Sequence, residues 1–199
     1  MDHEHPAEHP TATGLNNVKT IIWTFLASEC LFFGSLIASF LSYLGRPISG
    51  PGPKDVLNIP YTSISAFVLL LSSLFMVLAL AAMQQGDQRR MRIWLLGTAF
   101  LGMVFLGGQY FEFTTFFEHG LNPTTNLFGT TFFVLTGFHG THVSIGVIWL
   151  LSLFFTSRRG LLVAPQDSLK VEIAGLYWHF VDVVWIVIFT VVYLIPTSL

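Results

Sequence analysis

Five long apolar stretches, separated by short polar segments, dominate the pattern of hydrophobic and polar positions along this chain. They cover residues 18–44, 62–83, 93–117, 127–156 and 173–195. About 20 mostly apolar residues are enough for a helix to cross the hydrocarbon core of a bilayer. The period-2 alternation of a membrane-spanning strand is absent from these stretches. The pattern therefore predicts an all-α protein, a polytopic membrane helix bundle with five transmembrane helices.

The segments between the apolar stretches contain residues that interrupt helices. Pro47, the Gly-Pro run 50–53 and Pro123 lie in these segments, and proline removes a backbone donor that a helix interior needs. Residues 1–17 are acidic and histidine-rich rather than basic, unlike the start of a cleaved secretion signal. We predict a cytoplasmic N-terminal tail over 1–17, followed by one five-helix transmembrane domain over 18–199.

The composition agrees with a membrane protein. Hydrophobic residues make up 53% of the chain and charged residues 10%, whereas an average soluble domain is roughly 25% charged. The net charge of −2 gives no basis for nucleic-acid binding. Cys30 is the single cysteine of the sequence, which excludes an internal disulfide and multi-cysteine metal sites. It lies in an apolar stretch, so we interpret it as a small buried hydrophobic residue.

Basic residues between the spans predict the orientation of the chain in the membrane. Three segments that must share one side contain seven of them: Lys19, Arg89, Arg90, Arg92, Arg158, Arg159 and Lys170. The opposite side has two, Arg46 and Lys54. Cytoplasmic loops carry the excess of lysine and arginine. The N-terminus is therefore predicted in the cytoplasm and the C-terminus outside.

Six ionisable side chains lie inside the apolar stretches, where they are costly. They are Glu29, Glu112, His139, His142, His179 and Asp182. A charge at the bilayer centre costs about 3 kcal/mol on insertion scales, so such residues usually face a protein interior. Glu29 lies ten residues beyond Lys19, which is about 15 Å along a helix and near the midplane. The pairs 139/142 and 179/182 each have the spacing that places two side chains on one helical face.

Two kinds of chemistry fit this pattern, each beside a purely structural role. The histidines could ligate haem or copper, because neutral imidazole suits both metals. They could instead hydrogen-bond neighbouring helices and carboxylates, for example His179 with Asp182. Glu29 and Asp182 could relay protons, because a carboxyl group in a low-dielectric interior can exchange protons near neutral pH. Each could equally be a protonated carboxyl that donates one hydrogen bond between helices.

Four motifs resemble those of a known family. They are Trp-Thr-Phe-Leu-Ala-Ser-Glu-Cys-Leu-Phe-Phe at 23–33, Gln-Tyr-Phe-Glu-Phe at 109–113, Gly-Phe-His-Gly-Thr-His-Val at 137–143 and Tyr-Trp-His-Phe-Val-Asp-Val-Val-Trp at 177–185. Together they resemble subunit III of the haem–copper terminal oxidases, in its five-helix bacterial form. The resemblance covers all five spans. The longer members of that family have seven helices, and the first two are missing here, so an extended subunit I is a candidate to supply them.

The resemblance implies an accessory role rather than a catalytic one. It implies that this chain binds no haem or copper, which belong to subunits I and II, and that it has no catalytic residue or metal site of its own. Glu29 corresponds to a buried, carbodiimide-reactive and proton-related carboxyl. The other five residues correspond to an interior polar network of the bundle and its lipids. Direct contact with subunit I is implied, with subunit II and a small subunit IV as further partners, together with structural phospholipids.

The sequence thus favours an accessory, non-redox subunit III of a proton-pumping cytochrome c oxidase in a bacterial plasma membrane. Such a subunit supports proton uptake by subunit I and protects the catalytic centre during turnover. A subunit III of a quinol oxidase of the same superfamily is the main competing hypothesis. An independent dihaem cytochrome b and a small proton-coupled carrier are two more distant ones. The carrier lacks support because discontinuous helices and paired repeats, which carriers tend to show, are absent from the pattern.

Overall fold

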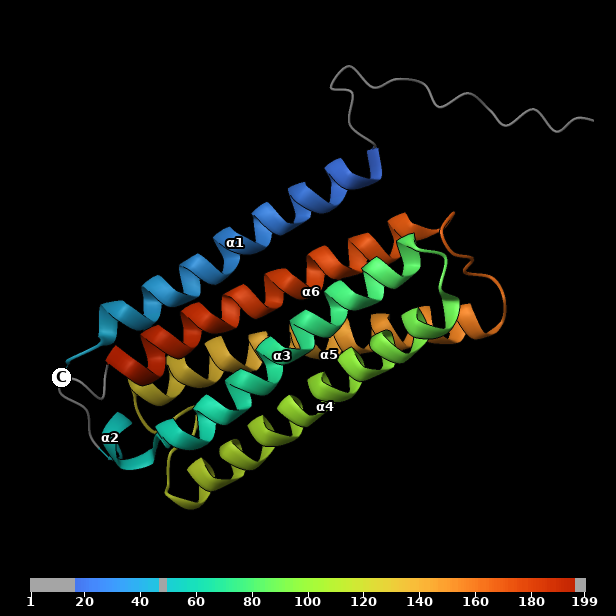
Figure 1. Cartoon of the computed structure of the whole chain (residues 1–199). Coiled ribbons are helices and arrows are strands. Elements are labelled where there is room, and N and C mark those ends of the chain that lie inside the picture. Colours follow the sequence, from blue (N-terminus) through green and yellow to red (C-terminus); the bar gives the residue numbers. More distant parts are fainter. Residues whose placement is uncertain (1–16, 47–49, 196–199) are drawn as a thin grey trace, which may run out of the picture.

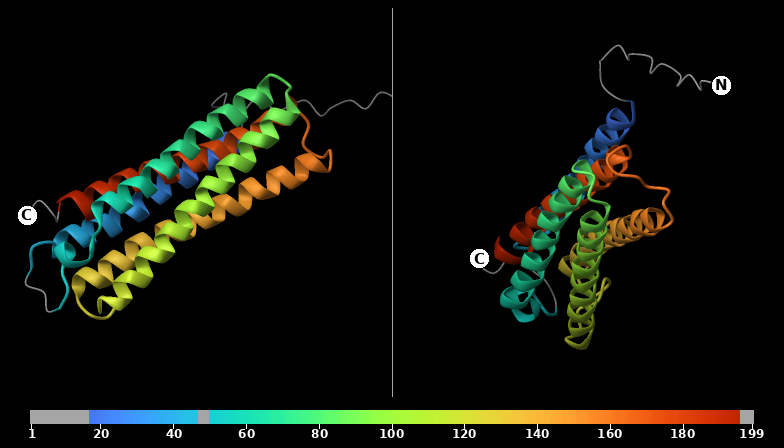
Figure 2. Two further views of the ribbon diagram at one scale, coloured as in Figure 1. Left: turned by 60° about the horizontal axis from the view of Figure 1, so that its bottom comes forward. Right: turned by 45° about the vertical axis from the view of Figure 1, so that its right-hand side comes forward.

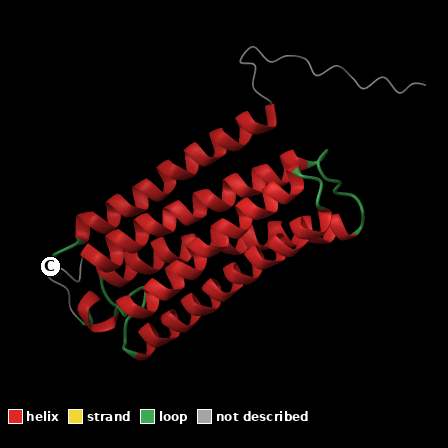
Figure 3. Cartoon of the chain, viewed as in Figure 1, coloured by secondary structure: helices red, strands yellow, loops and turns green. Residues whose placement is uncertain are grey.

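The computed structural model describes residues 17–46 and 50–195, and all of its regular structure is helical (Figures 1 and 3). The elements are α1 (Asn17–Tyr43), α2 (Pro53–Val56), α3 (Ile59–Gln84), α4 (Gln88–Glu118), α5 (Leu127–Arg158), α6 (Ser168–Ile188) and the π-helical stretch η1 (Phe189–Leu194). Five helices are long and apolar enough to cross a membrane, the fifth being α6 with η1. The predicted helical fold class is confirmed. Residues 1–16 of the predicted tail lie outside the described residues.

The helix ends differ from the limits of the apolar stretches because capping residues, rather than hydropathy, decide where a helix begins. Helix α4 begins at Gln88 instead of residue 93, since the Asp87 side chain accepts a hydrogen bond from the Arg90 N–H. Helix α3 begins at Ile59 because the Asn58 side chain accepts from the Tyr61 N–H. The short helix α2, in the segment between the first two spans, was not predicted.

Helices α3, α4, α5 and α6 pack around a common core, and α1 lies against α5 and α6 at its side (Figures 1 and 2). Successive long helices run in opposite directions (Figure 1). Helix α1 is the least covered of the five spans, and Cys30 on it is exposed. The interpretation of Cys30 as buried was therefore wrong for the isolated chain, because it lies on the face of α1 that α5 and α6 do not cover.

Trp178 lies where the four core helices meet. Its indole Nε1 donates to the Ser72 hydroxyl of α3 at 2.9 Å. A Cβ atom at Gly102 of α4 would be 2.6 Å from the indole, and one at Gly146 of α5 would be 2.7 Å from it. These two glycines admit the indole because they have no side chain, so they fix how closely α4 and α5 approach α6.

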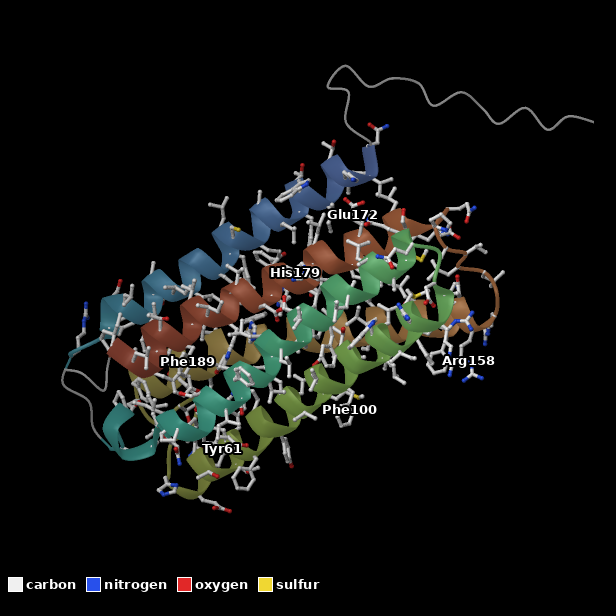
Figure 4. All side chains as sticks on the ribbon, viewed as in Figure 1. Tyr61, Phe100, Arg158, Glu172, His179 and Phe189 are labelled. Atoms are coloured by element: carbon white, nitrogen blue, oxygen red, sulfur yellow. The ribbon has the colours of Figure 1, made fainter. Side chains whose placement is uncertain are left out.

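Polar side chains connect neighbouring helices at the end of the bundle that was predicted to face the cytoplasm. Figure 4 labels Arg158 and Glu172 at this end. The Arg92 guanidinium donates to the Ser157 hydroxyl and carbonyl oxygens at 2.8 and 2.6 Å. Lys19 and Glu172 form an ion pair at 2.6 Å that joins α1 to α6. All three basic segments therefore lie at one end, as their predicted common side requires.

The loop before α6 ends in a local ion pair. The Asp167 carboxylate accepts from the Lys170 ammonium at 2.7 Å and from the Val163 N–H at 2.9 Å. Hydrogen bonding to Lys170, followed by the bond from Val163, lowers the pKa of Asp167 below its ordinary value. These contacts hold the carboxylate ionised next to the first turn of α6, where negative charge is favourable.

Candidate functional site

The six predicted site residues lie on four of the five long helices, α1, α4, α5 and α6. Figure 4 shows their side chains among the others along the bundle, with His179 labelled about halfway along α6. Their contacts divide them into separate groups rather than one shared polar interior. The groups are an acid–imidazole pair, a carboxyl clamp, a histidine enclosed by aromatic rings, and a histidine and a carboxyl that both lie near one serine.

Glu29 of α1 and His142 of α5 form the acid–imidazole pair. Glu29 Oε2 lies 3.1 Å from His142 Nε2, and the exposed fractions of their side chains are 19% and 14%. The other ring nitrogen, Nδ1, lies 2.8 Å from the carbonyl oxygen of Phe138. A carbonyl oxygen can only accept, so Nδ1 carries a proton. Nε2 and the carboxyl therefore share a single further proton, and the pair is neutral overall wherever that proton lies.

Aromatic side chains surround this pair at the contact between α1 and α5. The Phe33 ring packs edge-on against the His142 imidazole, with the ring centres 4.9 Å apart, and Phe32 lies further off at 6.3 Å. The Tyr177 hydroxyl of α6 donates to the backbone carbonyl of His142 at 2.9 Å. The imidazole is thus held by Phe33 of α1 and by the Phe138 carbonyl of its own helix, so its orientation toward Glu29 is fixed by packing as well as by hydrogen bonds.

Glu112 of α4 is the centre of the carboxyl clamp, and it is buried. Its Oε2 accepts from Gln109 Nε2 at 2.9 Å and from the Tyr193 hydroxyl at 3.1 Å. Its Oε1 lies 2.7 Å from the Thr62 hydroxyl. Thr62 is on α3 and Tyr193 is in η1. One carboxyl group therefore joins three elements at the end of the bundle opposite the arginine-rich loops.

His139 is enclosed by aromatic rings and is completely buried, with 0% exposure. Its imidazole stacks on the Trp185 indole at 4.9 Å with an angle of 24° between the planes, and the edge of the Phe105 ring packs against it. Neither ring nitrogen has a hydrogen-bond partner among the described residues. Although His139 and His142 are three residues apart, the first faces the core and the second faces α1.

His179 and Asp182 of α6 do not pair with each other as the sequence suggested. His179 Nδ1 instead lies 2.5 Å from the Ser73 hydroxyl of α3. Asp182 is buried and also interacts with Ser73, but neither of its oxygens makes a well-formed hydrogen bond within the part of the chain that the structure describes. The expected pairing is not formed because both side chains interact with the serine of the neighbouring helix instead.

Within residues 17–46 and 50–195, no three His, Cys, Asp or Glu side chains converge on a point where they could hold a metal ion. The structure adds partners that the sequence did not single out, namely Thr62, Ser73 and Tyr193. Hydroxyl residues are common in membrane helices, and their contacts here depend on tertiary packing, so no local signal marked them. Gln109 belongs to the 109–113 motif that carries the family resemblance, so the sequence had singled it out.

The chain is similar to proteins of one family over nearly its whole length. A sequence model of the family described as Cytochrome c oxidase subunit III matches residues 6–197. Cytochrome c oxidase subunit 3 of Bacillus sp. (strain PS3) is 37% identical over 190 residues, which are 95% of this chain and 90% of that protein. Quinol oxidase subunit 3 of Bacillus spizizenii is 39% identical over 190 residues, covering 95% and 92% of the two chains. Probable quinol oxidase subunit 3 of Staphylococcus aureus (strain USA300) is 39% identical over 179 residues, covering 89% and 88%.

Proposed function

The chain belongs to the cytochrome c oxidase subunit III family, and on this premise we propose that it is the accessory, non-redox subunit of a proton-pumping cytochrome c oxidase. It is a multi-pass membrane protein and subunit III of a haem–copper oxidase, a family that works in association with other oxidase subunits. The finer proposal is direct packing on subunit I in a bacterial plasma membrane, with subunit II and a small subunit IV as further neighbours. In this role the chain supports proton uptake and protects the catalytic centre.

The observation that carries the proposal is the neutral Glu29–His142 pair. A hydrogen bond between the carboxyl and the imidazole joins α1 to α5, and no electron-transfer group is needed for that contact. In the proposal Glu29 is the proton-related carboxyl. Glu112, His139, His142, His179 and Asp182 organise the bundle and the phospholipids bound to it. Haem and copper belong to subunits I and II.

The accessory role is tested in the intact oxidase complex with Glu29→Gln. We expect normal assembly and an initial rate of oxygen consumption close to that of the wild type. Complexes that lack the whole chain should begin at a similar rate and lose activity sooner during sustained turnover. Glu172→Gln, at the loop end of the bundle, is the control. Immediate loss of turnover in Glu29→Gln would show that the residue is catalytic and that the accessory role is wrong.

A quinol oxidase is favoured as the second candidate by a specific observation, because relatives with both names are about equally similar to this chain. The electron donor binds elsewhere in the complex, so the test concerns subunit II. Electron paramagnetic resonance of the purified complex should detect a copper centre in subunit II, and the complex should oxidise reduced cytochrome c. A complex without that copper signal that oxidises quinol instead would assign the chain to the quinol branch.

The proposed orientation, with the N-terminus in the cytoplasm and the C-terminus outside, rests on the basic segments gathered at one end of the bundle. It is tested by labelling single cysteines in intact cells, on a Cys30→Ser background, with a thiol reagent that does not cross membranes. Gln85→Cys, in the turn between α3 and α4, should react only after the cells are opened. His119→Cys, at the opposite end of α4, should react in intact cells. The reverse pattern would invert the topology.

A haem spectrum separates this proposal from an independent cytochrome b. The purified chain should show no haem absorbance, whereas the whole complex should show it. A haem spectrum from the chain alone would support a dihaem cytochrome. Substrate-dependent proton movement in vesicles that contain only this chain would support a proton-coupled carrier.

A further inference from the structure

The Thr62 hydroxyl, which is part of the Glu112 clamp, contacts two oxygen atoms but has a single hydrogen to donate. The Thr62 hydroxyl oxygen lies 3.0 Å from the carbonyl oxygen of Asn58 and 2.7 Å from Glu112 Oε1. A threonine hydroxyl has one hydrogen to donate and two lone pairs to accept with. The Asn58 carbonyl can only accept. If Thr62 donates to Asn58, the short contact with Glu112 is a hydrogen bond only when Glu112 provides the hydrogen.

Among the described residues, no charged side chain lies near Glu112 to balance an ionised carboxylate. No lysine, arginine or histidine of the described residues is among the side chains that interact with it. The titratable groups that face it are two phenols, Tyr61 of α3 and Tyr193 of η1. An unpaired charge inside a membrane span is costly. An ionised Glu112 would also have to take the Thr62 hydroxyl hydrogen, which would leave the Asn58 carbonyl with the backbone N–H of Thr62 as its donor.

A protonated Glu112 satisfies all four contacts at once. Its O–H donates from Oε1 to Thr62, and Thr62 donates to Asn58. Oε2 then accepts from Gln109 Nε2 and from the Tyr193 hydroxyl. Within these four contacts each hydrogen has one acceptor, and the four side chains Glu112, Thr62, Gln109 and Tyr193 carry no net charge. The carboxyl group thereby acts as donor and acceptor between α3, α4 and η1, a combination that a carboxylate cannot offer.

We propose that Glu112 is a second proton-binding site of this chain, a neutral carboxylic acid that holds its hydrogen on Oε1 and donates it to Thr62. This site is distinct from the Glu29–His142 pair, where the proton is shared with a base. At Glu112 no base of the described residues lies within hydrogen-bond reach, so the proton is retained and serves to clamp η1 against α3 and α4. The inference goes beyond the proposed function and does not depend on which electron donor the complex uses.

Infrared spectroscopy of the intact complex tests the protonation state directly. With ¹³C-labelled glutamate in the complex, the spectrum of the wild type minus that of Glu112→Gln at neutral pH should contain the carbonyl stretch of a protonated carboxylic acid. Tyr193→Phe removes one donor to Oε2, so the same band should move to higher frequency. A difference spectrum with carboxylate bands and no protonated-acid band would overturn the proposal, as would a Tyr193→Phe spectrum in which the acid band is unchanged.

The pH dependence of stability provides a second readout with a definite sign. At neutral pH the glutamate of the unfolded chain is already ionised. If the folded state still holds the proton there, its stability falls as the pH rises. The complex with wild-type Glu112 should therefore become less heat-stable than the Glu112→Gln complex as the pH is raised into the alkaline range. The opposite trend, in which the wild type loses stability relative to Glu112→Gln as the pH is lowered, would show that Glu112 is ionised.

Discussion

The tautomer assigned to His142 makes a sharp prediction about the residue opposite it. Because Nδ1 donates to the Phe138 carbonyl, a neutral His142 presents Nε2 as an acceptor toward Glu29. A glutamine at position 29 can donate its amide hydrogen to that nitrogen and keep the hydrogen bond. An alanine leaves Nε2 without a partner in a largely buried position. We therefore expect Glu29→Gln to be nearly neutral for stability and Glu29→Ala to be destabilising.

The size of the effect follows from the contact that is lost. The atoms are 3.1 Å apart and both side chains are mostly buried. Leaving such a group without its partner costs about 1–3 kcal/mol, whereas a retained hydrogen bond keeps the variant within about 1 kcal/mol of the wild type. The purified full chain can be unfolded in mixed micelles by increasing amounts of SDS. Tryptophan fluorescence then reports the free energy of unfolding.

The matched control is Ser28→Ala, one position before Glu29. Its hydroxyl is exposed and bonds only the carbonyl of Phe25 within the same helix, so its removal should change the unfolding free energy by less than about 0.5 kcal/mol. Glu29→Gln and Glu29→Ala with equal costs above about 1 kcal/mol would refute the reasoning. An amide would then be no better than a methyl group at this position, and Nε2 could not be the acceptor.

Contacts elsewhere in the bundle lead to three more predictions. Gly102→Ala would place a Cβ 2.6 Å from the Trp178 indole, whereas a Cβ at Gly107 meets nothing within 4 Å. In the SDS unfolding assay, Gly102→Ala should therefore be about 1–3 kcal/mol less stable than the control Gly107→Ala. His139→Phe keeps the aromatic packing and removes two buried nitrogens that have no partner among the described residues. The SDS unfolding midpoint should therefore be unchanged or higher, and a loss above about 2 kcal/mol would show that the nitrogens have partners. Lys19→Met removes a half-exposed ion pair with Glu172, so it should lower the free energy of unfolding by less than about 1 kcal/mol. This loss should become smaller when salt is added to the same assay.

Hydropathy was sufficient to predict the five spans, because length and apolar content alone decide whether a helix can cross a bilayer. It was insufficient for the helix ends, which side-chain caps such as Asp87 determine. Hydropathy also led to the prediction that Cys30 is buried, whereas Cys30 is exposed. The prediction failed because an apolar stretch in a membrane protein can face lipid or a partner as readily as its own core. Burial is a property of how helices pack, and composition does not contain it.

The pairing of Glu29 with His142 was only partly foreseeable. Counting residues from Lys19 put Glu29 near the middle of the membrane, and a partner at equal depth is a necessary condition for contact. Depth does not say which way a helix is rotated about its axis, and rotation decides which partner is met. The wrong pairing of His179 with Asp182 has another reason, because these two residues share one face of α6 and both meet Ser73 of the neighbouring helix α3. Tyr193 was missed for a related reason, since it reaches Glu112 from the π-helical end of the last span.

The two histidines of the 137–143 motif show why this rotation matters for function. Residues three apart on a helix differ by about 60° in direction, and here that difference separates two environments. His139 is packed between rings with both nitrogens unpaired among the described residues, so it has no group there with which to exchange a proton. His142 meets a carboxyl on the least covered helix of the bundle. Proton exchange in this chain is therefore expected at the contact of α1 with α5. The proton at Glu112, which has no base among the described residues within reach, stays in place and stabilises the bundle.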